Sequence, residues 1–334
     1  DRSKFEVYIY SYNKYEDETT KYIKSIANKF FNIADLGEID TVNLAIGHEL
    51  HIAIDLKGHT SNSRISIFAH RIAPIQISYL GYPGSIGLKS IDYLIADKVI
   101  IPEGYEHYYK EKIIYMPNSY QCNKKRIISK NKYKRTDIGL PEDSFVFTCF
   151  NSNYKIRPVE FDIWMKLLGN IKNSVLWLYK SNEQSEINLR KEALKRNIDP
   201  NRLIFAENVN QEEHLARHAC GDLFLDTFSC NAHTTASDAL WSGMPLITMP
   251  GKSFASRVAA SLLHSLEMKD LICENKEEYY KKAYKIANDP KELATLKKYI
   301  ESKKLTSSLF DSKKFTRELE KQLVEVYNTK INSY

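Results

Sequence analysis

Cysteine is scarce in this chain and follows no recognisable spacing. The 334 residues include 5 cysteines, which are Cys122, Cys149, Cys220, Cys230 and Cys273. The number is odd, and the sequence holds neither a CxxC pair nor a Cys/His grid of zinc type. Such usage is typical of reduced thiols inside cells and not of a disulfide framework. We therefore expect a cytoplasmic protein.

Long apolar runs are lacking as well. No stretch approaches the roughly 18 apolar residues that a membrane-spanning helix needs. No signal peptide opens the sequence, so we expect no membrane span and no secretion. Because the sequence starts at Asp1 and not at Met, we also expect that further chain precedes it.

The usual signatures of metal and nucleotide sites are missing. The sequence holds no Walker loop and no GxGxxG loop. No DxD-like pair of carboxylates follows a predicted strand, where it could hold a divalent metal. We therefore expect a reaction that needs no metal and no other cofactor.

A strong excess of one charge is also absent. The net charge of +6 comes from 48 basic and 42 acidic residues. The densest basic clusters, over 124–126 and 130–135, fall in an expected connecting segment that matches no known nucleic-acid-binding module. This favours a solvated linker over a nucleic-acid patch, so no nucleic-acid partner is expected.

What the chain does have is a regular alternation of strand and helix patterns in two series. The first series comprises strands over 5–10, 50–56, 75–80 and 93–96 and helices over 16–31 and 65–73. The second comprises strands over 145–150, 174–179, 203–205, 223–226 and 246–248, helices over 158–168 and 184–196, and helices starting at Gln211 and Thr234. Polar helices follow over 277–288, 291–303 and 313–332. Alternation predicts parallel sheets, and this length favours two lobes, which we place at 1–128 and 129–305.

The most informative stretch runs from Asp222 to Gly243, where a buried strand enters a small polar turn and then an apolar-periodic helix. The free N–H groups and the dipole of a helix N-terminus at Thr234 and Thr235 attract anions. Either threonine can equally be a plain N-cap. His233 precedes the turn as a phosphate donor or a structural loop histidine, and Asp238 is placed to reach a ribose or to remain solvated.

Other candidates are spread along the chain. Lys155 follows the strand over 145–150, where an ammonium group suits a diphosphate leaving group, although a surface lysine fits too. His214 and Arg217 are three residues apart and share a helix face that can stack on a base or face solvent. The turn that starts at Leu80 and Gly81 is structural or allows close backbone approach to a sugar.

Together these stretches resemble the catalytic region of the O-linked N-acetylglucosamine transferases and SPINDLY-like proteins, glycosyltransferase family 41, in its bacterial form. The matching segments, in family order, are DLKGHTSNSR (55–64), RIAPIQISYLGYPGS (71–85), DYLIAD (92–97), YMPNSY (115–120), FNSNYKI (150–156), SVLWL (174–178), DLFLDTFSCNAHTTASDALW (222–241) and MPGKSFASRVAAS (249–261).

The resemblance implies an α/β GT-B fold, in which two Rossmann-like lobes present facing parallel sheets. It implies that the helix over 306–334 returns toward the first lobe. The first lobe lacks the family's opening strand and Asp-Phe-x-x-His-like segment, so we expect an N-terminal truncation that removes acceptor-side residues. Tetratricopeptide repeats are expected upstream in the full-length protein.

The resemblance also implies residue roles. It makes Lys155 the catalytic lysine on the diphosphate and His233, Thr234 and Thr235 the phosphate contacts. It places Asp238 on the ribose, His214 and Arg217 near the uridine, and the Val209 backbone on the uracil edge. The remaining nucleotide-sugar residues that it assigns are Ser152, Tyr154, Gln211, Leu80 and Gly81.

The expected function is inverting, metal-independent transfer of a sugar, foremost N-acetylglucosamine, from a uridine diphosphate (UDP) donor to Ser or Thr of a protein acceptor. Ser152 stands where animal members carry a glutamine, and Gln211 where they carry a lysine. Three alternatives stay open at this point. The first is a glucosyl- or fucosyltransferase of the same family, and the second is a non-catalytic UDP-binding or scaffold fragment. The third is a GT-B enzyme that transfers a sugar to a small metabolite and not to a protein.

Overall fold

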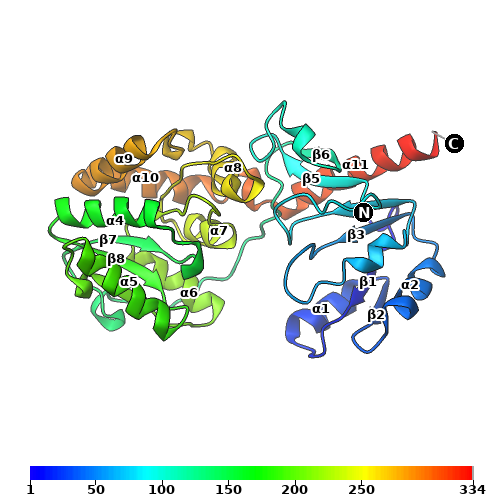
Figure 1. Ribbon diagram of the computed structural model, residues 1–334, viewed down its shortest axis with the longest axis horizontal. Coiled ribbons are helices and arrows are strands. Elements are labelled where there is room, and N and C mark those ends of the chain that lie inside the picture. The colour runs from blue at the N-terminus through cyan, green and yellow to red at the C-terminus, as the bar shows by residue number, and fades with distance from the viewer. Residues whose placement is uncertain (333–334) are drawn as a thin grey trace. The chain divides into compact units, whose positions relative to one another are not determined.

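The computed structural model describes residues 1–332, which divide into two compact units. Unit 1 consists of residues 1–96, 103–116 and the chain from Thr316 on, and unit 2 consists of residues 97–102 and 117–315. Each unit has parallel strands with helices packed around them, as Figure 1 shows. The predicted α/β class with parallel sheets is confirmed.

Unit 1 holds two separate sheets, with strand orders β1-β2 and β3-β4-β5-β6. Its elements are β1 (Tyr8–Ser11), α1 (Glu18–Ile26), β2 (Lys29–Asn32), α2 (Glu38–Ile46), β3 (Ile52–Asp55), α3 (Ser66–Ala69), β4 (Ile75–Ser78), β5 (Tyr93–Asp97), η1 (Glu106–Tyr108) and β6 (Lys112–Met116). Strands β1 and β2 pair in parallel, as do β3 with β4 and β4 with β5. A small core forms between α2, β3 and the region around α3, and residues of strands β4, β5 and β6 are buried as well.

Unit 2 holds one five-stranded parallel sheet with the order β11-β10-β7-β8-β9. Its elements are η2 (Thr136–Ile138), β7 (Phe145–Cys149), η3 (Asn153–Lys155), α4 (Pro158–Asn170), β8 (Ser174–Tyr179), α5 (Glu183–Lys195), η4 (Pro200–Arg202), β9 (Leu203–Ala206), α6 (Gln211–Arg217), η5 (His218–Cys220), β10 (Leu223–Leu225), α7 (Thr234–Trp241), β11 (Leu246–Ile247), η6 (Phe254–Ser256), α8 (Val258–Ser265), η7 (Lys269–Leu271), α9 (Lys276–Asn288), α10 (Pro290–Lys303) and η8 (Ser308–Phe310). The chain leaves β7 toward β8 and β9 and later returns to β10 on the other side of β7. The order therefore reverses between β7 and β10, and ligands of such folds bind beyond the carboxyl ends of strands at this point.

Continuous apolar runs explain why these strands form a central sheet. Phe147, Trp177 and Phe224 are fully buried within β7, β8 and β10. A parallel sheet covered by helices on both faces needs apolar residues at successive positions and not at alternate ones. Arg196, the C-cap of α5, pairs with Asp162 of α4 at 2.6 Å, so these two helices lie side by side against the sheet.

The predicted helix over 16–31 is correct only in its first part. Asp17 caps α1, since its carboxylate accepts a hydrogen bond from the Thr20 N–H at 2.7 Å. The helix ends at Ile26 because Ala27 is extended, and the aromatic segment Lys29–Asn32 pairs with β1 as a strand. The sequence prediction also missed α2, β6 and α8.

The units divide at Met116, earlier than the predicted lobe boundary at residue 128. Side chains explain the difference. The Trp241 indole N–H donates to the Arg126 carbonyl at 2.9 Å, and the Ser237 hydroxyl donates to the Asn123 side chain at 2.6 Å. The segment over 117–128 is therefore part of unit 2.

Helix α11 (Ser312–Ile331) begins in unit 2 and groups with unit 1 from Thr316 on. Within unit 1, the Tyr327 ring lies 5.0 Å from the His51 ring, measured between centroids. The Glu320 carboxylate pairs with the amino group of Asp1. These contacts tie the last helix to the first residues and to the start of β3.

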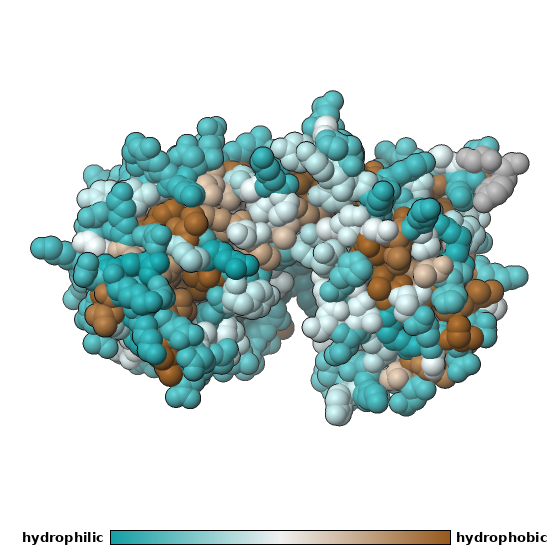
Figure 2. Space-filling model, in the orientation of Figure 1, coloured by the Kyte–Doolittle hydropathy of each residue, from teal (hydrophilic) through white to brown (hydrophobic). Residues whose placement is uncertain are grey.

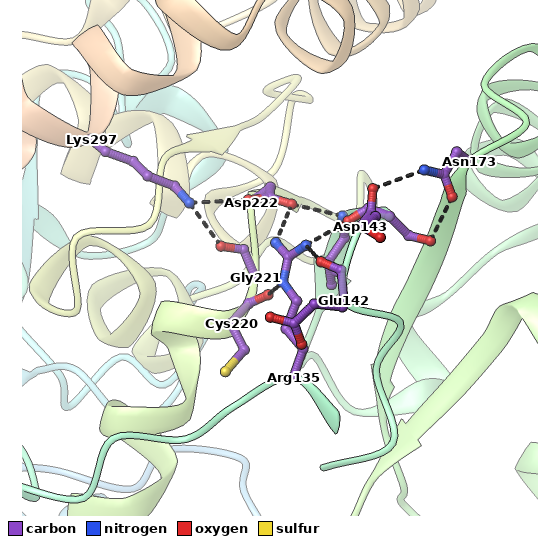
Figure 3. A network of polar contacts seen from close by, with 10 residues as sticks. Arg135, Glu142, Asp143, Asn173, Cys220, Gly221, Asp222 and Lys297 are labelled. Carbon is purple, nitrogen blue, oxygen red and sulfur yellow. Dashed lines mark hydrogen bonds and ion pairs between the residues drawn. The ribbon is translucent and has the colours of Figure 1, made fainter. Parts of the chain in front are cut away.

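A charged network closes the amino-terminal edge of the unit 2 sheet, as Figure 3 shows. Arg135 donates to the Asp222 carboxylate at 2.7 Å and to the Cys220 carbonyl at 3.1 Å. Lys297 donates to the other Asp222 oxygen at 3.1 Å. Asp222 also accepts the Val146 N–H at 2.9 Å, so the network fastens the basic connecting segment to β7 and β10.

Polar side chains cover most of the surface visible in Figure 2. Across residues 1–332, no helix combines the length and the apolar character needed to cross a membrane.

Candidate nucleotide site

A cavity of about 460 Å³ opens in unit 2 at the carboxyl ends of the central strands. It is lined by Phe150, Asn151, Ser152, Lys155, Tyr179, Asn208, Val209, Gln211, His214, Arg217, His233, Thr234 and Thr235. These residues follow β7, β8 and β9 or belong to α6 and the start of α7. The cavity therefore lies where the strand order reverses, as the fold rule requires.

Lys155 brings the loop after β7 to the loop after β10. It ends the short helix η3, and its ammonium group donates to the Asn231 carbonyl at 3.1 Å. The side chain is only partly buried and belongs to the cavity wall. A cation held in this way can meet an anionic ligand without first being reoriented.

The N-terminus of α7 forms the adjoining wall. Thr234 and Thr235 are the first two residues of this helix, and His233 is the N-cap. The first N–H groups of a helix have no partner within it and carry the positive end of its dipole. The Thr235 hydroxyl donates to the Asn151 side chain at 2.5 Å, which holds the helix start against the end of β7. Lys155 and this helix end together bring positive charge to one end of the cavity, which we call the anion site.

His233 is neutral at physiological pH. Burial, with a smaller contribution from Lys155, lowers its pKa to about 4. Its Nε2 lies 3.2 Å from the Ala255 carbonyl, and because a carbonyl only accepts, Nε2 carries the proton. Its Nδ1 is therefore unprotonated in the free pocket.

The opposite end of the cavity offers flat aromatic and guanidinium surfaces. The Arg217 guanidinium lies 5.3 Å from the centre of the Phe150 ring and donates to the Glu207 carbonyl at 2.6 Å. It also donates to His214 Nδ1 at 2.8 Å. Burial, and then the charge of Arg217, lower the pKa of His214 to about 4, so this imidazole is neutral as well. Such planar groups can pack against a nucleobase.

Most of the residues predicted from the sequence meet in this one cavity. They are Ser152, Lys155, Val209, Gln211, His214, Arg217, His233, Thr234 and Thr235. Their roles toward a ligand stay predictions.

Two predicted residues of unit 2 do not line the cavity. Tyr154 points to solvent, with 78% of its surface exposed. Asp238 is buried and forms an ion pair with Arg126. Burial raises the pKa of Asp238 to about 6 despite the opposing effect of Arg126. Its carboxylate is therefore engaged by the connecting segment, and a ribose contact would need Arg126 to move.

Leu80 and Gly81 belong to unit 1 and are described apart from this cavity. Leu80 adopts a positive φ of 69°. A Cβ atom at Gly81 would lie 2.0 Å from the Leu56 carbonyl oxygen, so only glycine fits there. The turn is therefore explained by close approach to the protein's own backbone.

The sequence prediction missed four lining residues: Phe150, Asn151, Tyr179 and Asn208. Phe150 and Asn151 directly follow β7, Tyr179 ends β8, and Asn208 follows β9 by two residues. A search of every strand end for aromatic and amide side chains would have found them.

A metal site is not formed by the described residues: nowhere in 1–332 do three or more His, Cys, Asp or Glu side chains gather closely enough to hold an ion. The cations and N–H groups around the cavity are the charges available to a ligand.

Comparisons with known proteins indicate the family to which the chain belongs. The sequence model of glycosyltransferase family 41 matches residues 1–132 and 121–319. The probable UDP-N-acetylglucosamine–peptide N-acetylglucosaminyltransferase SEC of Arabidopsis thaliana is 35% identical over 335 aligned positions. That match covers 98% of this chain and 34% of that protein. The probable enzyme of the same activity named SPINDLY, from Solanum lycopersicum, is 27% identical over 96% of this chain and 35% of its own length. The chain thus spans about a third of these curated relatives.

A solved structure is also similar along the whole chain. A mutant of the Thermobaculum terrenum O-GlcNAc transferase superposes with a TM-score of 0.93 at 26% identity. The match covers 100% of this chain and 64% of that one. The predicted GT-B fold and the resemblance to O-GlcNAc transferases are both confirmed.

Proposed function

This chain belongs to glycosyltransferase family 41, and we propose that it transfers N-acetylglucosamine from a UDP donor to Ser or Thr hydroxyls of a protein, with inversion and without a metal. One observation carries the proposal. Lys155 and the N-terminus of α7 meet in a single cavity at the point where the sheet order reverses.

The diphosphate of the donor fits the end of the cavity near Lys155. The ammonium group and the free N–H groups of Thr234 and Thr235 face the same space. Preorganised donors of this kind stabilise charge that develops on a leaving group. The negative charge of the donor also favours protonation of His233, whose Nδ1 then gains a proton to donate.

The uridine fits the other end. Phe150, His214 and Arg217 offer planar groups, and Val209, which is 39% exposed, also lines the cavity. All of the residues that line the cavity belong to unit 2. Unit 2 alone therefore supplies the UDP contacts in this proposal.

The reaction is a single displacement. The acceptor oxygen attacks the anomeric carbon of the sugar while the bond from that carbon to the diphosphate oxygen breaks. The acceptor hydroxyl gives up its proton to solvent, and UDP leaves with the electron pair of the broken bond. Lys155 and the start of α7 supply the positive charge that a divalent metal supplies in other enzymes, so chelators are expected to have no effect.

Ser152 and Gln211 lie in the cavity wall and set the local fit of the donor in this proposal. Neither side chain is charged. In this proposal, shape and hydrogen bonds therefore decide which base and which sugar bind. The protein acceptor, the upstream repeats and a cytoplasmic location belong to the same proposal, and the absence of disulfides among the described cysteines is compatible with that location.

The full-length protein, incubated with radiolabelled UDP-N-acetylglucosamine and a Ser/Thr peptide library, tests the proposal. We expect label on peptide hydroxyls, in equal amount with and without EDTA. Loss of transfer in EDTA with rescue by Mg²⁺ contradicts the metal-free mechanism. Label from UDP-glucose or a guanosine donor in preference to UDP-N-acetylglucosamine contradicts the assigned sugar.

A further inference from the structure

Beneath the anion site lies a carboxylate that does not line the cavity. Asp226 directly follows β10 and is fully buried. Behind it, the Tyr279 hydroxyl donates to its backbone carbonyl at 3.0 Å. A buried charge is costly unless it is fully hydrogen-bonded, so its partners show what it is for.

The Asp226 carboxylate closes the loop that leads from β10 to α7. Its Oδ1 accepts the N–H groups of Thr227 at 2.8 Å and of Ala232 at 2.6 Å. Its Oδ2 accepts the Thr248 hydroxyl at 2.6 Å. One oxygen thus binds both ends of the segment 227–232, and the other anchors the segment to the end of β11.

This loop carries the groups that shape the anion site. The Asn231 carbonyl, which belongs to it, holds Lys155 at 3.1 Å. Ala232 immediately precedes His233, the N-cap of α7. Asn151 donates to the Thr227 hydroxyl at 2.7 Å and accepts from the Thr235 hydroxyl at 2.5 Å. The position of Lys155 and the direction of the helix start therefore both depend on the loop.

We propose that Asp226 is a positioning residue for the diphosphate: it fixes segment 227–232 so that Lys155 and the N-terminus of α7 face one point. The inference rests on the proposed binding of UDP in this cavity. Asp226 touches no ligand itself and acts through the loop. Its effect is accordingly confined to the phosphate end and does not extend to the wall formed by Phe150, His214 and Arg217.

The charges around Asp226 agree with this role. Lys155 is the cation that faces it, and Cys149 and Tyr279 pack against it as ionisable neighbours. Burial raises the pKa of Asp226 to about 7 even though its hydrogen bonds lower it. Four donors point at the two oxygens, because the Asn151 amide lies 3.4 Å from Oδ1 in addition to the Thr227 and Ala232 N–H groups and the Thr248 hydroxyl. Acceptor oxygens are therefore the best fit at this position.

Substitutions separate the role of the acceptor oxygen from that of the charge. Asp226→Asn keeps Oδ1 for the two loop N–H groups and turns its amide toward the Thr248 hydroxyl, which can accept as well as donate. Asp226→Ala removes both acceptors and leaves the two buried N–H groups without a partner. The alanine variant is therefore expected to release the loop, and the asparagine variant to retain it in large part.

Calorimetric titration of each protein with UDP and with uridine is the test. We expect Asp226→Ala to bind UDP at least about tenfold more weakly than wild type. We expect uridine affinity to stay within about twofold, since the base wall is unchanged, and Asp226→Asn to recover most of the UDP affinity. If Asp226→Ala only lowered the stability of the fold, it would weaken the binding of UDP and of uridine alike.

Asp97 provides the matched control. Only 1% of its surface is exposed, and it lies outside the cavity wall. Its carboxylate accepts hydrogen bonds from the backbone N–H groups of Val99 and Ile100 and from the Ser261 hydroxyl. Asp97→Ala is expected to lower the melting temperature without changing the ratio of UDP to uridine affinity. Thr248→Val is a milder probe of the Asp226 network, and we expect it to weaken UDP about threefold and to leave uridine unchanged, even if Asp226→Ala does not fold.

Two results overturn the inference. One is that Asp226→Ala or Thr248→Val weakens the binding of UDP and of uridine by the same factor. The other is that neither variant changes the ratio of UDP affinity to uridine affinity from its wild-type value. Either result leaves the proposed function intact if the wild-type protein binds UDP. Absence of UDP binding by wild type contradicts the proposed function itself and the inference with it.

Discussion

At the scale of residues, the cavity separates two kinds of contact. Lys155 and the first residues of α7 present positive charge, whereas Phe150, His214 and Arg217 present planar surfaces. In the proposal, the charged diphosphate of a ligand binds at the first end and its base binds at the second. Substitutions at the two ends are therefore expected to affect UDP and uridine differently.

Arg217→Met removes a guanidinium from the base end while keeping much of its apolar stem. We expect UDP and uridine affinities to fall together, by about three- to tenfold, because a cation–π contact contributes about 0.5–2 kcal/mol. Calorimetry with both ligands checks this. Arg196→Met is the matched control, since Arg196 lies 5.3 Å from the Phe161 ring, outside the cavity wall. Loss of UDP affinity with unchanged uridine affinity contradicts the assignment of Arg217 to the base.

Asp226 gives a prediction for stability against pH. Burial raises its folded pKa to about 7, whereas an unfolded aspartate titrates near about 3.9. Folding therefore binds a proton between these values, and this contribution to stability is present at low pH and lost as pH rises through about 7. Asp226→Asn cannot titrate. Its stability relative to wild type should rise by a few kcal/mol, roughly, between pH 5 and pH 8.

Urea unfolding of both proteins at these two pH values measures that difference. Taking the difference between the two proteins cancels the contributions of the buried histidines His214 and His233 to the free energy of unfolding, because these residues titrate alike in both. A constant gap between variant and wild type at pH 5 and pH 8 means that Asp226 is not a buried group with a raised pKa.

Single residues also show what the sequence could predict about the site. The strand and helix patterns make Lys155, His233 and Thr234 candidates, and the family resemblance assigns their roles. Asp238 was placed by the same logic, but its partner Arg126 comes from a distant connecting segment that local pattern does not reveal. Asp226 was overlooked because it reads as the last residue of a strand, and its bonds to Ala232 and Thr248 exist only in the folded chain.

At the scale of elements, the sheet of unit 2 is fixed at both of its edges. The carboxyl edge forms the cavity, and the amino edge is closed by Arg135, Asp222 and Lys297, as Figure 3 shows. The Asp222 side chain is only 10% exposed, so its charge depends on these two cations. The basic connecting segment, which the sequence analysis interprets as a solvated linker, thus supplies a partner for the buried Asp222 carboxylate.

Arg135→Ala is therefore expected to destabilise the protein by about 2–4 kcal/mol, because it leaves Asp222 and several carbonyl groups with fewer partners. The midpoint of urea unfolding measures the effect. Lys195→Ala is the control, since Lys195 is 69% exposed in its pair with Glu192, and exposed pairs contribute about 0–1 kcal/mol. Equal effects of the two substitutions contradict a structural role for the network.

Elements of unit 2 were easier to predict than those of unit 1. Strand β8 was predicted with its observed bounds because its apolar run is continuous and buried. Helix α1 was extended too far, since the residues of β2 also fit a helical period and pair with β1 only across the fold. Short elements such as α3 leave too few residues for a period to decide between helix and strand.

At the scale of the whole molecule, the chain consists of two α/β units, and all residues that line the cavity proposed to bind UDP belong to unit 2. The chain spans about a third of its curated relatives, so transfer to a protein is proposed for the longer molecule. Binding of UDP, in contrast, is proposed for this chain as it stands. The central claim can therefore be tested without any acceptor.

Calorimetric titration with UDP in the presence of EDTA is the most direct test, applied to wild type, Lys155→Ala and Lys281→Ala. Lys281 is a matched lysine that is 70% exposed and pairs with Glu277 on α9. We expect wild type and Lys281→Ala to bind UDP equally, and Lys155→Ala to bind at least about tenfold more weakly, because a charged hydrogen bond contributes about 1.5–3 kcal/mol. Absence of UDP binding by wild type, or equal binding by Lys155→Ala, would contradict the account.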